Sequence, residues 1–68
     1  MIRCNLSRLM GERKMKVADV ARETTLNRHA ISALYNETAR KIDLVAIDEL
    51  CKLFECSVGD LFERIEDE

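Results

Sequence analysis

The sequence lacks several features that would place the protein in other structural classes. Its 68 residues contain no proline, no tryptophan and only two glycines, and no stretch alternates apolar with polar residues as a half-buried strand does. No apolar run is long enough to span a membrane, and no charged-then-apolar leader resembles a signal peptide. Internal repeats, low-complexity segments and linkers are absent as well. We therefore expect a single small domain, residues 1–68, built from helices alone.

Cysteines are few, and their pattern argues against two further classes. The chain has three, Cys4, Cys51 and Cys56, and an odd number suits a reducing cytoplasm better than a disulfide scaffold. Because the chain has only one histidine, Cys51 and Cys56 do not complete a zinc-ligand pattern. We expect each cysteine to be a small buried or half-buried apolar residue, with no metal, no cofactor and a cytoplasmic location.

Charge is distributed unevenly along a chain whose net charge is −2. Residues 1–41 carry nine basic and four acidic side chains, whereas residues 42–68 carry two basic and nine acidic ones. A basic half of this kind indicates a polyanionic partner. The alternative is a protein whose acidic half only limits aggregation, and the two interpretations do not exclude each other.

Residues 17–36 have the pattern of two short helices with a tight turn between them. Apolar residues recur at helical spacing on both sides of the polar segment 24–27. Asn27 ends that segment and can cap the second helix by accepting hydrogen bonds from its first N–H groups. The outer face of the second helix then carries Arg28, His29 and Ser32. A helix that is apolar behind and hydrogen-bonding in front, with a helix before it, is the helix-turn-helix layout for reading a DNA major groove.

Three more helices are expected around this pair. Asn5 can cap a first helix, and Asp43 can cap a fourth one that follows a polar loop over residues 36–41. Ser57 and Asp60 have the spacing of a capping box at the start of a short fifth helix. The side chains that we expect to face the core are Leu6, Leu9 and Met10 in the first helix, Tyr35 in the third, Leu44, Ile47, Leu50, Cys51 and Phe54 in the fourth, and Val58, Leu61 and Phe62 in the fifth.

The two ends of the chain are expected to be less regular. Residues 1–4 read as a short extended lead-in, and the acidic end over about residues 63–68 is expected to be frayed. The predicted fold class is all-α, a compact bundle of five short helices.

The same residues resemble a known family, the Cro/XRE-type helix-turn-helix regulators with the lambda-repressor-like fold. The resemblance runs from Asn5 to Phe62, and two positions depart from it. Thr25 stands where members usually have a glycine in a left-handed turn, so the turn is either built differently or strained. Lys16 stands where members often have a serine or threonine cap. The residues that carry the resemblance are Ala21, Leu26, Ile31, Leu34, Asn36 and the segment C-S-V-G-D-L-F at 56–62.

The resemblance also implies roles for individual residues. The base-reading side chains would be Arg28, His29, Ser32 and Ala33, with Arg28 pairing with guanine and Ala33 touching a thymine methyl group. The alternative is that Arg28 and His29 are solvated surface residues of an ordinary helix. The residues that could contact DNA phosphates, judged from their places beside the two helices, are Lys14, Lys16, Val17, Asn27, Asn36, Arg40 and Lys41. The alternative is that the single lysines are only surface charge.

Two classes of function remain open for this sequence. The first, which the resemblance favours, is a sequence-specific DNA-binding transcriptional regulator, a repressor of bacterial or phage type that binds double-stranded DNA. The second is a protein-interaction module, an antitoxin or adaptor with a protein partner, which the acidic half favours. We do not expect an enzyme, because no nucleophile is placed beside His29.

Because one recognition helix reads few base pairs, we expect a weak homodimer that DNA strengthens. Its contact is predicted near the fourth and fifth helices, through Phe54, Val58, Phe62 and Ile65.

Overall fold

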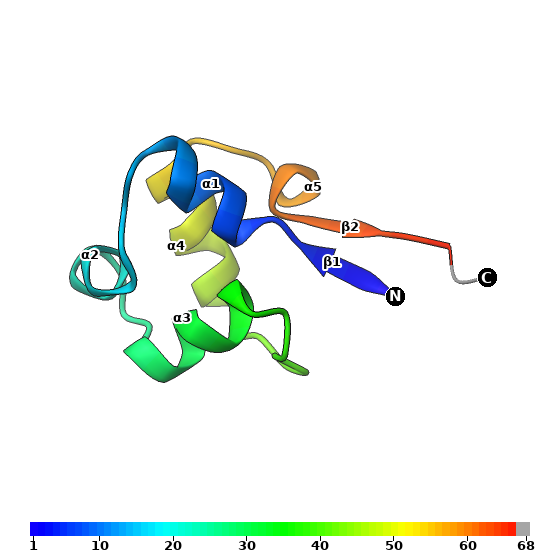
Figure 1. Ribbon diagram of the computed structural model, residues 1–68, viewed down its shortest axis with the longest axis horizontal. Coiled ribbons are helices and arrows are strands. Elements are labelled where there is room, and N and C mark those ends of the chain that lie inside the picture. Colours follow the sequence, from blue (N-terminus) through cyan, green and yellow to red (C-terminus); the bar gives the residue numbers. More distant parts are fainter. Residues whose placement is uncertain (67–68) are drawn as a thin grey trace.

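The computed structural model describes residues 1–66, which form five helices and two short strands (Figure 1). Four helices begin directly after the residues predicted to precede them, Asn5, Asn27, Asp43 and Ser57, whereas Phe62, expected in the fifth helix, lies in a strand. No helix of the described residues is long and apolar enough to cross a membrane. In chain order the elements are β1 (Ile2–Cys4), α1 (Leu6–Glu12), α2 (Val17–Glu23), α3 (Arg28–Tyr35), α4 (Leu44–Phe54), α5 (Val58–Leu61) and β2 (Phe62–Arg64).

The all-α prediction is wrong in one respect, because β1 and β2 pair as a two-stranded antiparallel sheet. Cys4 lies opposite Phe62, and the N–H of Ile65 donates a hydrogen bond of 2.8 Å to the carbonyl of Met1. Strands of three residues are too short to show an alternating pattern, and their partners come from the two ends of the chain. Part of the end expected to be frayed therefore lies in β2, whereas residues 67 and 68 lie outside the described residues.

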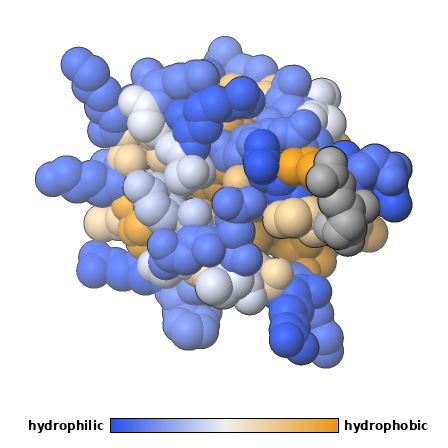
Figure 2. Space-filling view, turned by 45° about the vertical axis from the view of Figure 1, so that its right-hand side comes forward, coloured by the Kyte–Doolittle hydropathy of each residue, from blue (hydrophilic) through white to orange (hydrophobic). Residues whose placement is uncertain are grey.

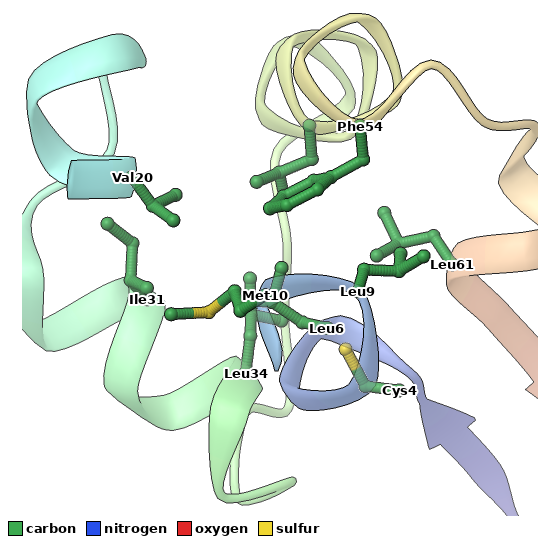
Figure 3. Close-up of a cluster of buried hydrophobic side chains, with 10 residues drawn as sticks. Cys4, Leu6, Leu9, Met10, Val20, Ile31, Leu34, Phe54 and Leu61 are labelled. Atoms are coloured by element: carbon green, nitrogen blue, oxygen red, sulfur yellow. The ribbon is translucent and has the colours of Figure 1, made fainter. Parts of the chain in front are cut away.

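A single apolar cluster joins the elements (Figure 3). All five helices contribute to it, with Leu6 and Met10 from α1 facing Ile31 and Leu34 from α3. Burying one such side chain stabilises the fold by roughly 1.5–3 kcal/mol. The cluster thus holds α3 by one face and leaves the opposite face to solvent. Its remaining members are Cys4, Leu9, Val20, Leu50, Phe54 and Leu61.

The cysteines are placed as predicted. Cys4 is buried, Cys51 and Cys56 are half-buried, and all three are free thiols. Burial raises the pKa of the Cys4 thiol above its usual value, which keeps the thiol neutral and suits its place in the apolar cluster.

Leu44 and Val58, two of the apolar residues expected in the core, are exposed instead. The buried stripe of α4 runs through Ala46, Leu50 and Phe54, one turn apart, and Leu44 is 81% exposed. Leu44 lies on the far side of the helix from Ala46, since two residues correspond to about 200° of rotation. Val58, the first residue of α5, is 54% exposed, because this short helix buries only Leu61.

Local caps explain where most helices begin. The side chain of Asn27 accepts the N–H of Ala30 at 2.8 Å, and Asp43 accepts the N–H of Val45 at 2.8 Å. Ser57 and Asp60 form the predicted reciprocal capping box at the start of α5. Asn5 differs from the prediction, because no side-chain cap bond starts α1. Its amide instead donates to the carbonyl of Asp60 at 3.2 Å, which joins the start of α1 to α5.

Candidate nucleic-acid interface

The outer face of α3 presents the four residues predicted to read bases. Arg28 and His29 are exposed, and Ser32 and Ala33 are half-buried deeper along the same helix. Within residues 1–66, neither Arg28 nor His29 has a hydrogen-bond or ion-pair partner. Both side chains are therefore free to bind an external ligand. Tyr35 at the end of the helix, which we expected in the core, is 44% exposed.

The turn before α3 does not use a left-handed residue. The non-glycine residues with positive φ are Lys14, Glu37 and Glu55 among those described, so Thr25 carries no such strain. Its N–H and its hydroxyl both donate to the Glu49 carboxylate of α4, at 3.2 Å and 2.7 Å. The turn is thus held by a contact with α4 and does not need the left-handed glycine that is usual at this position. Sequence inspection missed Glu49 because it lies 24 residues further along the chain.

The rest of the turn is closed by Thr24. Its hydroxyl donates to the carbonyl of Val20 at 2.8 Å and accepts the N–H of Leu26 at 3.3 Å. The backbone polar groups of a turn need partners when they are shielded from water. The Thr24 hydroxyl is such a partner for two of them, the Val20 carbonyl and the Leu26 N–H.

The start of α2 places an acidic group among the predicted phosphate contacts. A lysine side chain has no acceptor, so Lys16 cannot cap the helix itself; its N–H instead donates to the Asp19 carboxylate at 2.8 Å. This bond, followed by one from Arg22, holds the pKa of Asp19 below its usual value. The charged carboxylate works against an approaching phosphate near Val17, which makes this end of α2 a weaker phosphate site than the sequence suggests.

The loop after α3 holds two of the predicted phosphate contacts in exposed positions. The N–H of Thr38 returns to the carbonyl of Ala33 at 2.8 Å, and the Glu37 carboxylate accepts the N–H of Cys4 at 3.1 Å. Both bonds anchor the loop just before Arg40 and Lys41, which are exposed. The remaining predicted contacts, Lys14, Lys16, Asn27 and Asn36, are also exposed, and Val17 is half-buried.

Two grooves border α3 and the loop after it. The first, of about 400 Å³, separates the first half of α3 from the start of α4 and includes His29, Ala30, Val45 and Ala46 in its walls. The second, of about 260 Å³, lies between β1 and α4. Figure 2, with the sheet end of the molecule turned forward, shows hydrophobic surface on the right among mostly hydrophilic side chains. The apolar lining of the second groove comes from Ile2, Ile42, Ile47 and Phe62, with Arg40 and Lys41 beside them.

Comparisons with known proteins agree with this geometry. The sequence model of the Cro/C1-type HTH DNA-binding domain matches residues 5–67. The chain is 31% identical over 64 residues to YozG of Bacillus subtilis (strain 168), an uncharacterized HTH-type transcriptional regulator; the match covers 94% of this chain and 76% of YozG. No solved structure shows a significant match. With α2 and α3 forming the helix-turn-helix and nearly the whole chain matched, this protein belongs to the Cro/C1-type HTH DNA-binding domain family.

Proposed function

We propose that this DNA-binding protein is a sequence-specific transcriptional repressor of bacterial or phage type, with α3 as its recognition helix. The observation that carries the proposal is the two-sided character of α3. Ile31 and Leu34 are buried, at 0% and 4% exposure, and fix one face of the helix in the core. Arg28 and His29 lie on the other face, with no hydrogen-bond or ion-pair partner among residues 1–66. A helix held this way can enter a major groove without leaving its own core.

The four residues of this face are suited to different contacts with base edges. Arg28 has a long side chain, and its guanidinium matches the O6 and N7 acceptors of guanine. His29 donates to a base or a phosphate oxygen. Ser32 and Ala33 are half-buried, so they reach only bases that come close to the helix, with Ala33 against a thymine methyl group.

Phosphate contacts around α3 would set the protein's register on the duplex. Arg40 and Lys41 follow the helix on an anchored loop, and they are the strongest candidates because no carboxylate forms an ion pair with them within the described residues. Asn27 and Asn36 flank α3 at its two ends. Lys14, Lys16 and Val17 complete the set near the start of α2, where Asp19 reduces the local positive potential.

A homodimer would place two recognition helices about one turn of DNA apart, roughly 34 Å. The sequence-based surface needs revision, because Phe54 is only 4% exposed and lies in the core. The exposed apolar residues Ile2 and Leu44, at 61% and 81%, lie on the sheet and on the first turn of α4, the two elements that border the second groove. We place the dimer contact there, with a second copy of the chain as the occupant, and expect the dimer to be weak until DNA holds both copies.

Selection of bound sequences from a random DNA pool tests the proposal directly. The expected result is an enriched site with two similar half-sites, which binds more weakly as salt rises. If the pool yields no preferred sequence and the affinity depends on salt concentration alone, sequence-specific recognition is contradicted. In that case the alternative gains weight: an antitoxin or adaptor that binds a protein partner through the apolar second groove.

A further inference from the structure

One contact links the helix-turn-helix turn to the rest of the molecule. The Glu49 carboxylate of α4 accepts the Thr25 hydroxyl at 2.7 Å and the Thr25 N–H at 3.2 Å. We propose that Glu49 is a positioning residue for DNA binding, which sets the direction in which α3 leaves the turn. This inference rests on the proposed function, since it concerns the helix assigned there to base recognition.

Packing holds the first turn of α3 on one side, through Leu26, which packs against the apolar cluster, and through Ile31. The first groove, of about 400 Å³, lies between this part of the helix and α4, with Ala30 on one side and Val45 on the other. Of the buried anchors, Ile31 ends this first turn and Leu34 lies about one turn further along the helix. Arg28 and His29 are exposed in this turn, so a contact between the turn and α4 can still adjust their position relative to the body.

Among the hydrogen bonds of residues 1–66, those from Thr25 to Glu49 are the ones that tie the turn segment 24–27 to α4. The Thr24 bonds run to Val20 and Leu26 and stay within the helix-turn-helix, so they move with it. The Asn27 cap bonds to Ala30 within α3. Because a hydrogen bond to a charged group is about twice as strong as one between neutral groups, the Glu49 contact can set the turn's position relative to the body.

Because Glu49 is charged, a positioning role and a purely electrostatic role predict different changes in DNA affinity when Glu49 is removed. A carboxylate near a DNA-binding face repels phosphates, so its removal should by charge alone strengthen binding to every DNA sequence. Loss of positioning has the opposite sign at the preferred site, because Arg28 and His29 then meet the wrong base edges. Asp48, the exposed neighbour of Glu49, pairs with Lys52 at 3.1 Å and makes no contact with the turn, so it serves as the matched control.

The experiment measures the affinity of Glu49→Ala and Asp48→Ala for the selected site and for random DNA, well below their melting temperatures. We expect Glu49→Ala to weaken binding to the selected site about tenfold, with affinity for random DNA unchanged or higher. Asp48→Ala should shift both affinities together. Glu49→Gln should restore most of the preference, because its amide oxygen still accepts the Thr25 N–H. The double variant Thr25→Val/Glu49→Ala should bind the selected site about as weakly as Glu49→Ala alone, since both substitutions remove the same bond between the Thr25 hydroxyl and Glu49.

A readout that does not use DNA completes the test. Residual dipolar couplings of the backbone amides in residues 28–35, measured against those of α1, report the orientation of α3 in wild type and Glu49→Ala. An unchanged orientation, or affinities that shift in parallel as for Asp48→Ala, would overturn the proposal. If wild type selects no DNA site and Glu49→Ala still reorients α3, the positioning inference stands and the proposed function fails.

Discussion

Arg28 is the single residue on which base recognition would depend most. It is the first residue of α3, it is exposed, and no carboxylate within the described residues pairs with it. An arginine in such a position is held in place by its helix rather than by a partner, so its guanidinium remains able to form two parallel hydrogen bonds with one guanine.

Arg28→Ala should therefore weaken binding to the selected site by about 1–3 kcal/mol and relax the preference at one base pair. Lys41→Ala is the matched comparison, because a phosphate contact contributes equally to all sequences and its loss lowers the salt slope by about one. Binding titrations over a range of salt, on the selected site and on random DNA, measure both effects. An equal loss on the two DNAs for Arg28→Ala would identify Arg28 as a phosphate contact.

Thr25 occupies a turn position where family members usually have glycine, and it does so without a positive φ. If Thr25 had positive φ, Thr25→Gly would relieve strain and leave stability unchanged or higher. Since its φ is not positive, glycine instead removes the hydroxyl bond to Glu49 and adds freedom to the unfolded chain. We expect a loss of about 1–2 kcal/mol, seen as a lower Tm in thermal unfolding. Thr25→Ser, which keeps the hydroxyl, should lie close to wild type; a Tm for Thr25→Gly at or above wild type would show that the bond to Glu49 is not stabilising.

At the scale of helices and strands, the buried face of α3 links stability to function. Ile31 and Leu34 lie three residues apart on the side that enters the core, between α1 and α2 (Figure 3). Because they hold α3 from behind, their loss affects the fold before it affects any DNA contact.

Ile31→Ala and Leu34→Ala should each lower the free energy of unfolding by roughly 2–5 kcal/mol, a large part of what a domain of this size has. Urea unfolding followed by circular dichroism measures the loss. Val58→Ala is the control, because Val58 is 54% exposed and its truncation should change stability little. Equal stability of all three variants would contradict the packing of α3 described above.

The capping box of α5 predicts a dependence of stability on pH. Hydrogen bonds with the N–H and side chain of Ser57 hold the pKa of Asp60 below its usual value. A carboxyl with a lowered pKa in the folded state stabilises the fold above its unfolded pKa, and this contribution disappears as pH falls through the folded pKa. Asp60→Asn should therefore be less stable than wild type at neutral pH, with a difference that shrinks below about pH 4. Unfolding curves from pH 7 to pH 2 test this; a difference independent of pH would exclude the charge of Asp60 as its cause.

At the scale of the whole molecule, the helix-turn-helix and the sheet lie at opposite ends (Figure 1). The sheet joins the two ends of the described chain, with Ile2 opposite Arg64. This arrangement leaves the side of the molecule around β1 and the start of α4 free for contacts other than the recognition helix.

The proposed homodimer can be located with two exposed residues. Leu44→Lys should abolish self-association and lower affinity for the palindromic site, while Tm stays the same because Leu44 is 81% exposed. Val58→Lys places the same charge on α5 and should leave association unchanged. Sedimentation at rising protein concentration, with and without the selected site, measures the association. If Val58→Lys dissociates the dimer and Leu44→Lys does not, the contact lies on α5, as part of the surface first predicted from the sequence near the fourth and fifth helices.

The sequence by itself determined the features that depend on residues a few positions apart. The ranges of the helices, the Asn27, Asp43 and Ser57 caps, and the buried face of α3 could be predicted because helical periodicity and capping act within one or two turns. The family resemblance added proposed roles for the exposed residues on α3, which periodicity alone does not suggest.

Tertiary structure decided what depends on residues distant in sequence. The pairing of β1 with β2 and the Thr25–Glu49 contact join segments with no local pattern to reveal them. The exposure of Leu44 was missed for a related reason: apolar spacing shows that α4 has a buried stripe, but which neighbouring residues form it depends on how the helix is rotated against its partners. Such rotations and long-range contacts are set by the packing of the whole core, because each is stable only when the elements around it are already in place.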